Sequence, residues 1–382
     1  KDLNINSGTL DFASNSTFNL VGDFIMNGGT FTAVGSGAHE LEGNWKETAG
    51  IFQAGEGTIL MNGSVSKDIE TIIGNFFNNL TIGDGVDTKV VQTNTDKTIN
   101  IEANFTVAAN GTFDVLASHS LTLEDAVVTG TLTATASAGN IALINFNTAT
   151  DASLTVTGAL TLTGTSTTER NAKISSSSGP SDITFDIQGT FSGTDFTIED
   201  PDGDGFNLTG TNLPTIVRGT FDNPANSGCL LNFVDQRNLP VSIDGCVFAN
   251  TSGATGAKNV KANGATANNT GDVVTFLNYS GVLANDGTTA EANDEETIEG
   301  HIEWFNNIYY SEAGEDHSPS DNNGVVLTNW YSQQNGGGFK APLSALTNSD
   351  VTWRIDASTM TTNNNWSISG SLEILERLAL KG

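Results

Sequence analysis

The sequence predicts an all-β fold, a right-handed parallel β-helix (a β-solenoid) with coils of about 20 residues and a less regular C-terminal half. Three observations lead to this prediction. A stretch of about 21 residues repeats near the N-terminus. Within each repeat, apolar and polar residues alternate over short runs, which is the pattern of a strand with one buried face. Gly and Asn interrupt these runs, where tight turns need residues that tolerate a positive φ.

The repeats begin at Leu3, Phe24 and Trp45, and their residues agree in chemistry position by position. One coil is too short to bury its own apolar face, whereas stacked coils bury a continuous core. Stacking places like residues over like residues, with strands about 4.8 Å apart. The matching columns are Gly8, Gly29 and Gly50; Leu10, Phe31 and Phe52; Phe12, Ala33 and Ala54; Leu20, Leu41 and Met61; and Gly22, Gly43 and Gly63.

Weaker copies of the pattern continue along the chain. We interpret segments 79–82, 104–107 and 159–162 as copies of one repeated strand. Gly-Thr-Phe also recurs, at 111–113, 189–191 and 219–221, and Gly-Thr-Leu occurs at 130–132.

This pattern predicts regular coils over residues 1–200. Over residues 201–382 we expect a continuing β-helix with longer coils and inserted loops, which project near 285–298 and 311–323. No amphipathic helix is expected before residue 370.

The composition limits the partners of the chain. The formal net charge is −29, with 15 Lys+Arg against 44 Asp+Glu. Nucleic acid binding needs a basic patch, so we expect no nucleic acid partner. No apolar run is long enough for a membrane helix, so no membrane insertion is expected.

The residue pattern of the first repeats resembles that of a known protein family. GTFTAVGSGAHELEGNW, GIFQAGEGTILMNGSVSKDI and FFNNLTIGDG look like the repeats of large secreted bacterial β-helix proteins, of the filamentous-haemagglutinin-like and autotransporter-adhesin-like kind. The resemblance implies a secreted, extracellular or cell-surface location. It carries little information about function, because such repeats record stacking geometry.

One acidic motif is a candidate calcium site. Asp200, Asp202 and Asp204 alternate around Gly203, as in the first half of a calcium-binding loop, where hard oxygen ligands converge on the cation. Thr211 stands where a bidentate Glu would complete such a loop. The alternative interpretation is a solvated acidic turn between coils. Calcium is the one candidate cofactor.

Cys229 and Cys246 are separated by about one short coil. They could stack on adjacent coils and form a disulfide, which would suit an oxidising exterior. The alternative is two buried thiols in an apolar column. His39 falls in the column of Phe18, so we expect it to point inward.

Enzymes on this fold need grouped carboxylates or a bound cation in a groove. Gly300-His301-Ile302 and Arg354-Ile355-Asp356 differ from the motifs of pectinolytic relatives at the decisive residue, so we expect no enzymatic activity. Thr131, Thr133 and Thr135, and again Thr161, Thr163 and Thr165, could form flat outward ladders that organise water or ice. The alternative is the ordinary preference of Thr for strands.

These observations predict an extracellular structural protein, a segment of a filament or rod built by head-to-tail stacking. The expected contact sets Leu3, Ile5 and Leu10 against Leu378 and Leu380. The first alternative is a cell-surface adhesin or glycan-binding module, with Trp330 and Tyr331 as candidate ligand contacts. The second is a polysaccharide-degrading enzyme, which would require a groove of clustered acids.

Overall fold

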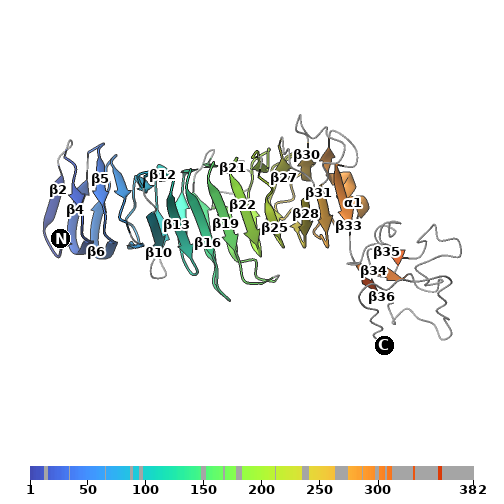
Figure 1. The fold of residues 1–382 in the computed structure, drawn as a ribbon, viewed down its shortest axis with the longest axis horizontal. Helices are drawn as coiled ribbons and strands as arrows, with labels where there is room; N and C mark the ends of the chain where they lie inside the picture. The colour runs from blue at the N-terminus through green and yellow to red at the C-terminus, as the bar shows by residue number, and fades with distance from the viewer. Residues whose placement is uncertain are drawn as a thin grey trace.

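The computed structural model shows an elongated parallel β-solenoid of about 11 turns, with about 24 residues in each turn (Figure 1). The coils follow one another in sequence order along the long axis, from β1 near the N-terminus to β33. The structure describes residues 1–305, apart from 13–15, 34, 65, 87–88, 94–97, 148–151, 167, 178–182, 211, 235–240, 263–273, 286 and 297–300, together with residues 308–311, 330–331 and 352–354.

Three parallel sheets form the sides of the solenoid. Sheet I contains β1 (Leu3–Ile5), β2 (Thr9–Phe12), β4 (Phe24–Ala33), β6 (Trp45–Gln53), β8 (Lys67–Glu70), β10 (Lys89–Thr93), β13 (Gly111–Leu116), β16 (Thr131–Thr135), β19 (Ala159–Thr163), β22 (Thr190–Thr194), β25 (Thr215–Val217), β28 (Val241–Asp244), β31 (Val274–Leu277) and β33 (Ile302–Phe305).

Sheet II is shorter than sheet I. It contains β11 (Thr98–Asn100), β14 (Ser120–Leu123), β17 (Ala142–Phe146), β20 (Ala172–Ser176), β23 (Phe196–Glu199), β26 (Thr220–Asp222) and β29 (Val247–Phe248).

Sheet III runs nearly the full length of the solenoid. It contains β3 (Asn19–Leu20), β5 (Ala38–Leu41), β7 (Thr58–Met61), β9 (Asn79–Ile82), β12 (Asn104–Val107), β15 (Asp125–Val128), β18 (Ala152–Val156), β21 (Ile183–Ile187), β24 (Phe206–Leu208), β27 (Cys229–Phe233), β30 (Lys258–Ala262) and β32 (Glu295–Glu296).

The register confirms the predicted columns. Leu10 pairs with Phe31 and Phe31 with Phe52, while Leu20 pairs with Leu41 and Leu41 with Met61. The predicted inward position of His39 is also confirmed, because its side chain is buried and its ring stacks on that of Phe18.

Alternation of inward and outward residues builds the core. In β13 and β17 every second residue is buried, and these residues form one continuous apolar cluster through the solenoid. Aromatic rings stack between coils at both ends: Phe24 lies 4.1 Å from Trp45 between ring centroids, and Phe276 lies 4.5 Å from Trp304. Burial of these large rings supplies much of the driving force for folding.

One sequence interpretation is wrong. Segment 79–82 does stack with 104–107 in sheet III, but 159–162 forms β19 in sheet I. The recurring Gly-Thr-Phe motif also occupies more than one side: Thr220 and Phe221 belong to β26 in sheet II, whereas the other Gly-Thr-Phe and Gly-Thr-Leu copies enter sheet I. The apolar–polar pattern is the same on every sheet, so a short motif cannot tell which side of the coil it occupies.

The region near 285–298 contains a helix that the sequence analysis did not expect, α1 (Gly287–Asn293). Ala290 of this helix is fully buried, and its carbonyl accepts a hydrogen bond from Asn259 Nδ2 at 2.9 Å. The segment therefore packs against the last coils. A helix of about two turns with little apolar character gives no periodic signal, and tertiary contacts hold it in place.

The ladder crosses residue 200 without interruption, since β21 pairs with β24 and β24 with β27. Beyond β33, β34 (Ile308–Ser311), β35 (Trp330–Tyr331) and β36 (Thr352–Arg354) form a separate three-stranded sheet. The predicted loop at 312–323 lies outside the described residues.

Glycine is required where the coils approach most closely. A Cβ on Gly158 would lie 1.9 Å from the carbonyl oxygen of Gly130, whereas a Cβ on Gly203 would meet no atom within 4 Å. We expect Gly158→Ala to lower the free energy of unfolding by at least about 2 kcal/mol, because the ladder must separate to admit the methyl group.

The matched control is Gly203→Ala, which we expect to change stability by less than about 0.5 kcal/mol. Urea unfolding followed by circular dichroism measures both. Equal midpoints for the two variants would show that the coils are not packed at this distance.

Candidate functional site

The structure does not bring the three predicted calcium ligands together. Asp200 is buried at the corner after β23, where its carboxylate accepts hydrogen bonds from Ser176 N and from Asn223 Nδ2 at 3.0 and 3.1 Å. Asp202 instead accepts from Thr184 Oγ1 and from Asp204 N. Across the described residues, no group of three or more His, Cys, Asp or Glu side chains is placed to hold a metal ion.

Asp200 has a structural role at this corner. Its φ is 62° and that of Asn223 is 56°, so both residues make the left-handed bend between sheets II and III in successive coils. Asp and Asn adopt this conformation more readily than other non-glycine residues. Burial raises the pKa of the Asp200 carboxyl.

The predicted disulfide is absent, and both cysteines are free, buried thiols. Cys229 begins β27 in sheet III and pairs with Lys258 in the next coil. Cys246 immediately precedes β29 in sheet II. Since the two thiols belong to different sides of the solenoid, the alternative of two buried thiols is the one observed. Burial raises the pKa of each to about 12.

The predicted stacking residues of the first coil lie on the outermost strands of sheet I. Ile5 is buried, whereas Leu3 and Leu10 are partly exposed. In the second coil their partners Phe24, Met26 and Phe31 are completely buried. Leu378 and Leu380 lie outside the described residues.

A groove of about 340 Å³ follows the corner between sheets II and III. It lies where sheet II begins: in the described residues, the coils before β11 contribute strands only to sheets I and III. The lining residues come from four successive coils and are mostly polar. They are Gly74, Asn75, Phe76, Asn100, Ile101, Glu102, Thr122, Leu123, Glu124 and Asn147.

Two carboxylates give the groove its charge. Glu102 follows β11 and Glu124 follows β14, so the same corner position of adjacent coils carries an acid in each. Partial burial raises the pKa of Glu102, and the negative charge of Glu124 raises it further. Such a pair can accept hydrogen bonds from hydroxyl groups of a ligand. No sequence motif indicates this pair, because the two residues are 22 positions apart.

A buried polar network holds the floor of the groove. Glu47, in β6, is completely buried and accepts hydrogen bonds from Trp45 Nε1 and Asn75 Nδ2, both at 2.8 Å. Asn75 Oδ1 in turn accepts from Phe52 N at 3.2 Å. These bonds fix the segment before β9, so Asn75 and Phe76 keep their positions in the groove.

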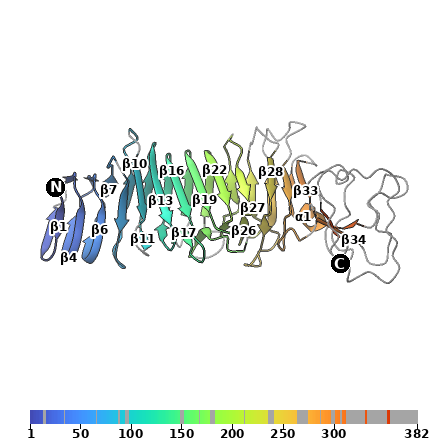
Figure 2. The same ribbon diagram turned by 60° about the horizontal axis from the view of Figure 1, so that its bottom comes forward.

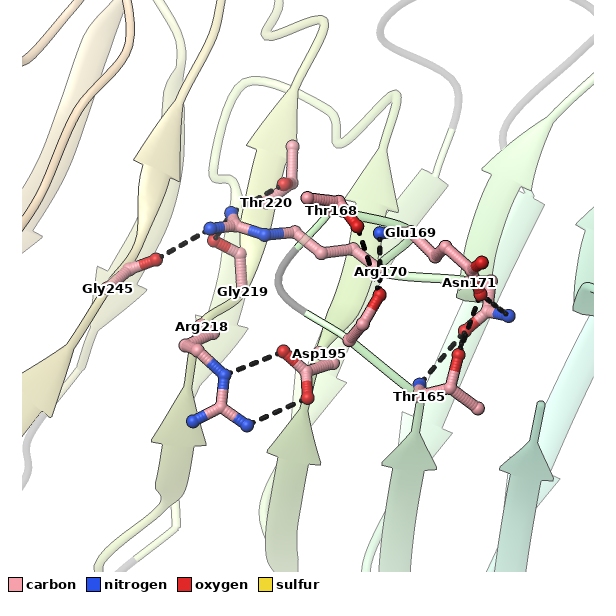
Figure 3. Close-up of polar contacts among 11 residues, drawn as sticks. Thr165, Thr168, Glu169, Arg170, Asn171, Asp195, Arg218, Gly219, Thr220 and Gly245 are labelled. Carbon is pink, nitrogen blue, oxygen red and sulfur yellow. Dashed lines mark hydrogen bonds and ion pairs between the residues drawn. The ribbon is translucent and has the colours of Figure 1, made fainter. Parts of the chain in front are cut away.

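Arginines tie several coils together at the corner between sheets I and II (Figure 3). Arg218 donates two hydrogen bonds to Asp195, at 2.7 and 2.8 Å. Arg170 reaches across to the carbonyl oxygens of Gly219 and Gly245, both at 2.9 Å, and to Thr220 Oγ1.

This corner has a structural role. Asp195, Arg218 and Gly245 follow β22, β25 and β28, and each has a positive φ that turns the chain out of sheet I. The Arg218 guanidinium lowers the pKa of the Asp195 carboxyl. Both guanidinium groups already donate hydrogen bonds to protein atoms. We therefore assign the cluster to stabilising the bend rather than to ligand binding.

One further carboxyl group is strongly perturbed. Asp294, directly after α1, accepts a hydrogen bond from Trp304 Nε1 at 2.8 Å. Burial raises its pKa to about 7, and the nearby Glu291 and Glu296 act in the same direction.

No family model, curated protein or solved structure matches this chain in the three comparisons. The fold itself therefore defines the class, a parallel β-solenoid. Among the described residues no helix is both long and apolar enough to cross a membrane.

Asp294 makes stability depend on pH. The unfolded chain releases this proton near pH 3.8, whereas the folded chain retains it until about pH 7. The folded state therefore binds more protons in this interval, and stability falls as the pH rises through it. We expect Asp294→Asn to reduce this fall, because an amide carries no charge to desolvate.

Thermal unfolding of the wild type and of Asp294→Asn at pH 4, 6 and 8 measures the effect. The control is Asp204→Asn, at an exposed carboxyl group. If Asp294→Asn and the control depend on pH as steeply as the wild type, burial of Asp294 does not contribute.

Proposed function

We propose that this chain is a structural segment of an extracellular or cell-surface rod, in which a further coil, from another copy or from another segment of a longer chain, stacks on its first coil. The observation that carries the proposal is the parallel ladder, which continues from β1 to β33 and in which β1 pairs with β4 alone among the described strands. Unpartnered strand edges recruit other strands unless they are blocked. Such a contact is heterologous, so repeated contacts build a filament.

The side chains of the first coil support the same proposal. Leu3, Leu10, Phe12, Phe18 and Leu20 pack against the core but are only partly buried. A coil placed over them would bury these residues as the second coil buries its own. The gain would be about 25 cal/mol for each Å² of apolar surface removed from water.

The location is part of the proposal. The sequence resembles secreted bacterial β-helix proteins of the filamentous-haemagglutinin-like and autotransporter-adhesin-like kind, in which long solenoids stand outside the cell. The net charge of −29 is compatible with a hydrated, soluble surface.

Asn4→Pro tests the open edge. Leu3 N donates to Asp23 O on the covered side of β1, at 2.9 Å. Successive residues of a strand point their N–H groups to opposite edges, so that of Asn4 points outward. Proline removes this donor and introduces its ring at an edge position where the fold tolerates it. We expect filaments of the wild type in electron micrographs at high protein concentration, and short particles from Asn4→Pro.

Asn4→Ala is the matched control, because it alters the same side chain but keeps the N–H group. It should form filaments like the wild type, and both variants should unfold at the same temperature. Monodisperse short particles from the wild type at every concentration would contradict the proposal.

Glycan binding is a second candidate, favoured by the groove at the corner of sheets II and III. Carboxylates and amides line it beside the partly buried ring of Phe76, and Ile73 next to it is fully exposed. Paired acids with a raised pKa on one member are also what hydrolysis of a glycosidic bond requires.

Glu102→Gln tests this candidate. We expect at least about tenfold weaker binding of neutral oligosaccharides in calorimetry, because a hydrogen bond to a charged group is worth about 1.5–3 kcal/mol. Glu56→Gln, on an exposed turn, is the control. Release of reducing ends in the same samples would distinguish cleavage from binding. Equal affinities for the wild type and Glu102→Gln would exclude the groove.

A further inference from the structure

The outer face of sheet I carries no charge from β16 to β25. In a chain with 44 Asp+Glu and 15 Lys+Arg, this is an unusual stretch. Nine of its eleven outward residues carry a hydroxyl group. They are Thr131, Thr133 and Thr135 in β16; Ala159, Thr161 and Thr163 in β19; Thr190, Ser192 and Thr194 in β22; and Thr215 and Val217 in β25.

These hydroxyl groups stand in register. Thr133 pairs with Thr161 and Thr161 with Ser192, while Thr135 pairs with Thr163 and Thr163 with Thr194. The register of Ser192 with Thr215 extends the first of these columns into β25. Figures 1 and 2 show β16, β19 and β22 side by side along the rod.

The core fixes the direction of these side chains. Leu132, Ala134, Leu160 and Leu162 alternate with the threonines, and all four are completely buried. A rotation of either strand would expose them, so the threonines are held outward. Branching at Cβ restricts χ1, so each hydroxyl also has few orientations.

The hydroxyl groups in the middle of this face have no partner within the described part of the chain. Thr135, Thr161, Thr163, Ser192 and Thr194 make no side-chain hydrogen bond there. Only the margins differ: Thr133 donates to Asp114, and Thr190 Oγ1 accepts a hydrogen bond from Asn212.

Several hydroxyl groups on the other sides are used by the fold. Thr184 and Thr209 donate to Asp202 and Asp186, Thr197 donates to the Arg170 carbonyl, and Ser153 donates to Asp125. The face of sheet I is thus distinguished by its hydroxyl content, and by the hydroxyl groups in its middle that make no hydrogen bond to the described part of the chain.

The spacing of the face defines a two-dimensional lattice. Neighbouring strands lie about 4.8 Å apart, and alternate residues along a strand are separated by about 6.6 Å. Oxygen atoms in the surface planes of hexagonal ice repeat at two distances of similar size. From this match, together with the absence of charge, we infer that the face from β16 to β25 binds ice, through a layer of water ordered by the threonine hydroxyl groups.

Other ligands fit this face less well. A charged partner would find no opposite charge at its eleven outward positions. No aromatic ring is among them, so a sugar ring would have no surface on which to stack. The inference is independent of the stacking proposal, since it concerns the side of the rod and not its end.

Partition into slowly grown ice tests the inference. We expect the wild type to be enriched in the ice fraction over a non-binding protein of similar size, and to produce thermal hysteresis. Thr161→Lys places a long charged chain at the centre of the face and should abolish both effects. Thr163→Lys, at a more exposed position, should do the same if the first variant does not fold.

The matched control is Thr155→Lys. Thr155 is an outward, partly exposed threonine in β18, the strand of sheet III that immediately precedes β19. This variant should retain the ice affinity of the wild type, and circular dichroism should show equal unfolding temperatures for all variants.

Two outcomes would overturn the inference. The wild type could fail to enter ice, or Thr161→Lys and Thr163→Lys could enter it as well as the wild type. If the wild type fails to enter ice and Thr161→Lys abolishes dimerisation in light scattering, or adsorption to cellulose particles, the face belongs to a second copy or to a neutral polysaccharide.

Discussion

Parallel hydrogen bonding between one coil and the next is the constraint on which the structure depends. A single coil cannot enclose its apolar side chains, so each coil is stable only beneath or above a neighbour. The neighbour must lie close and in register. Gly158 is required for this reason, because its backbone lies against the carbonyl of Gly130. The bends at Asp195 and Arg218 turn the chain at the same corner in two successive coils.

The groove follows from a change within this regular stack. The first coils enclose their core with sheets I and III, using the long strands β4 and β6. Among the described residues sheet II begins at β11, and the segment before β9 lies in the coil that precedes it. Inside the protein, the hydrogen bond that Asn75 donates to Glu47 holds this segment in place. The carboxylates of Glu102 and Glu124 then line the corner on the outside.

The sides and the end of the rod therefore differ in chemistry. The first coil presents apolar side chains that are only partly buried. One corner presents acids and amides, which favour hydroxyl-bearing ligands. The face of sheet I from β16 to β25 presents uncharged hydroxyl groups in two dimensions. A solenoid can combine these properties because its outward residues vary freely while its inward residues remain apolar.

The sequence by itself determined the solenoid, the first columns and the inward position of His39, because each coil repeats local alternation and close spacing that are visible along the chain. It also indicated the threonine ladders. The tertiary structure alone decided that residues 159–162 enter sheet I, that Cys229 and Cys246 lie on different sides, and that Asp200 turns a corner. It alone brought Glu102 beside Glu124. These outcomes depend on the length of every intervening turn, which sets the side of the coil that a residue reaches and leaves no periodic trace in the sequence.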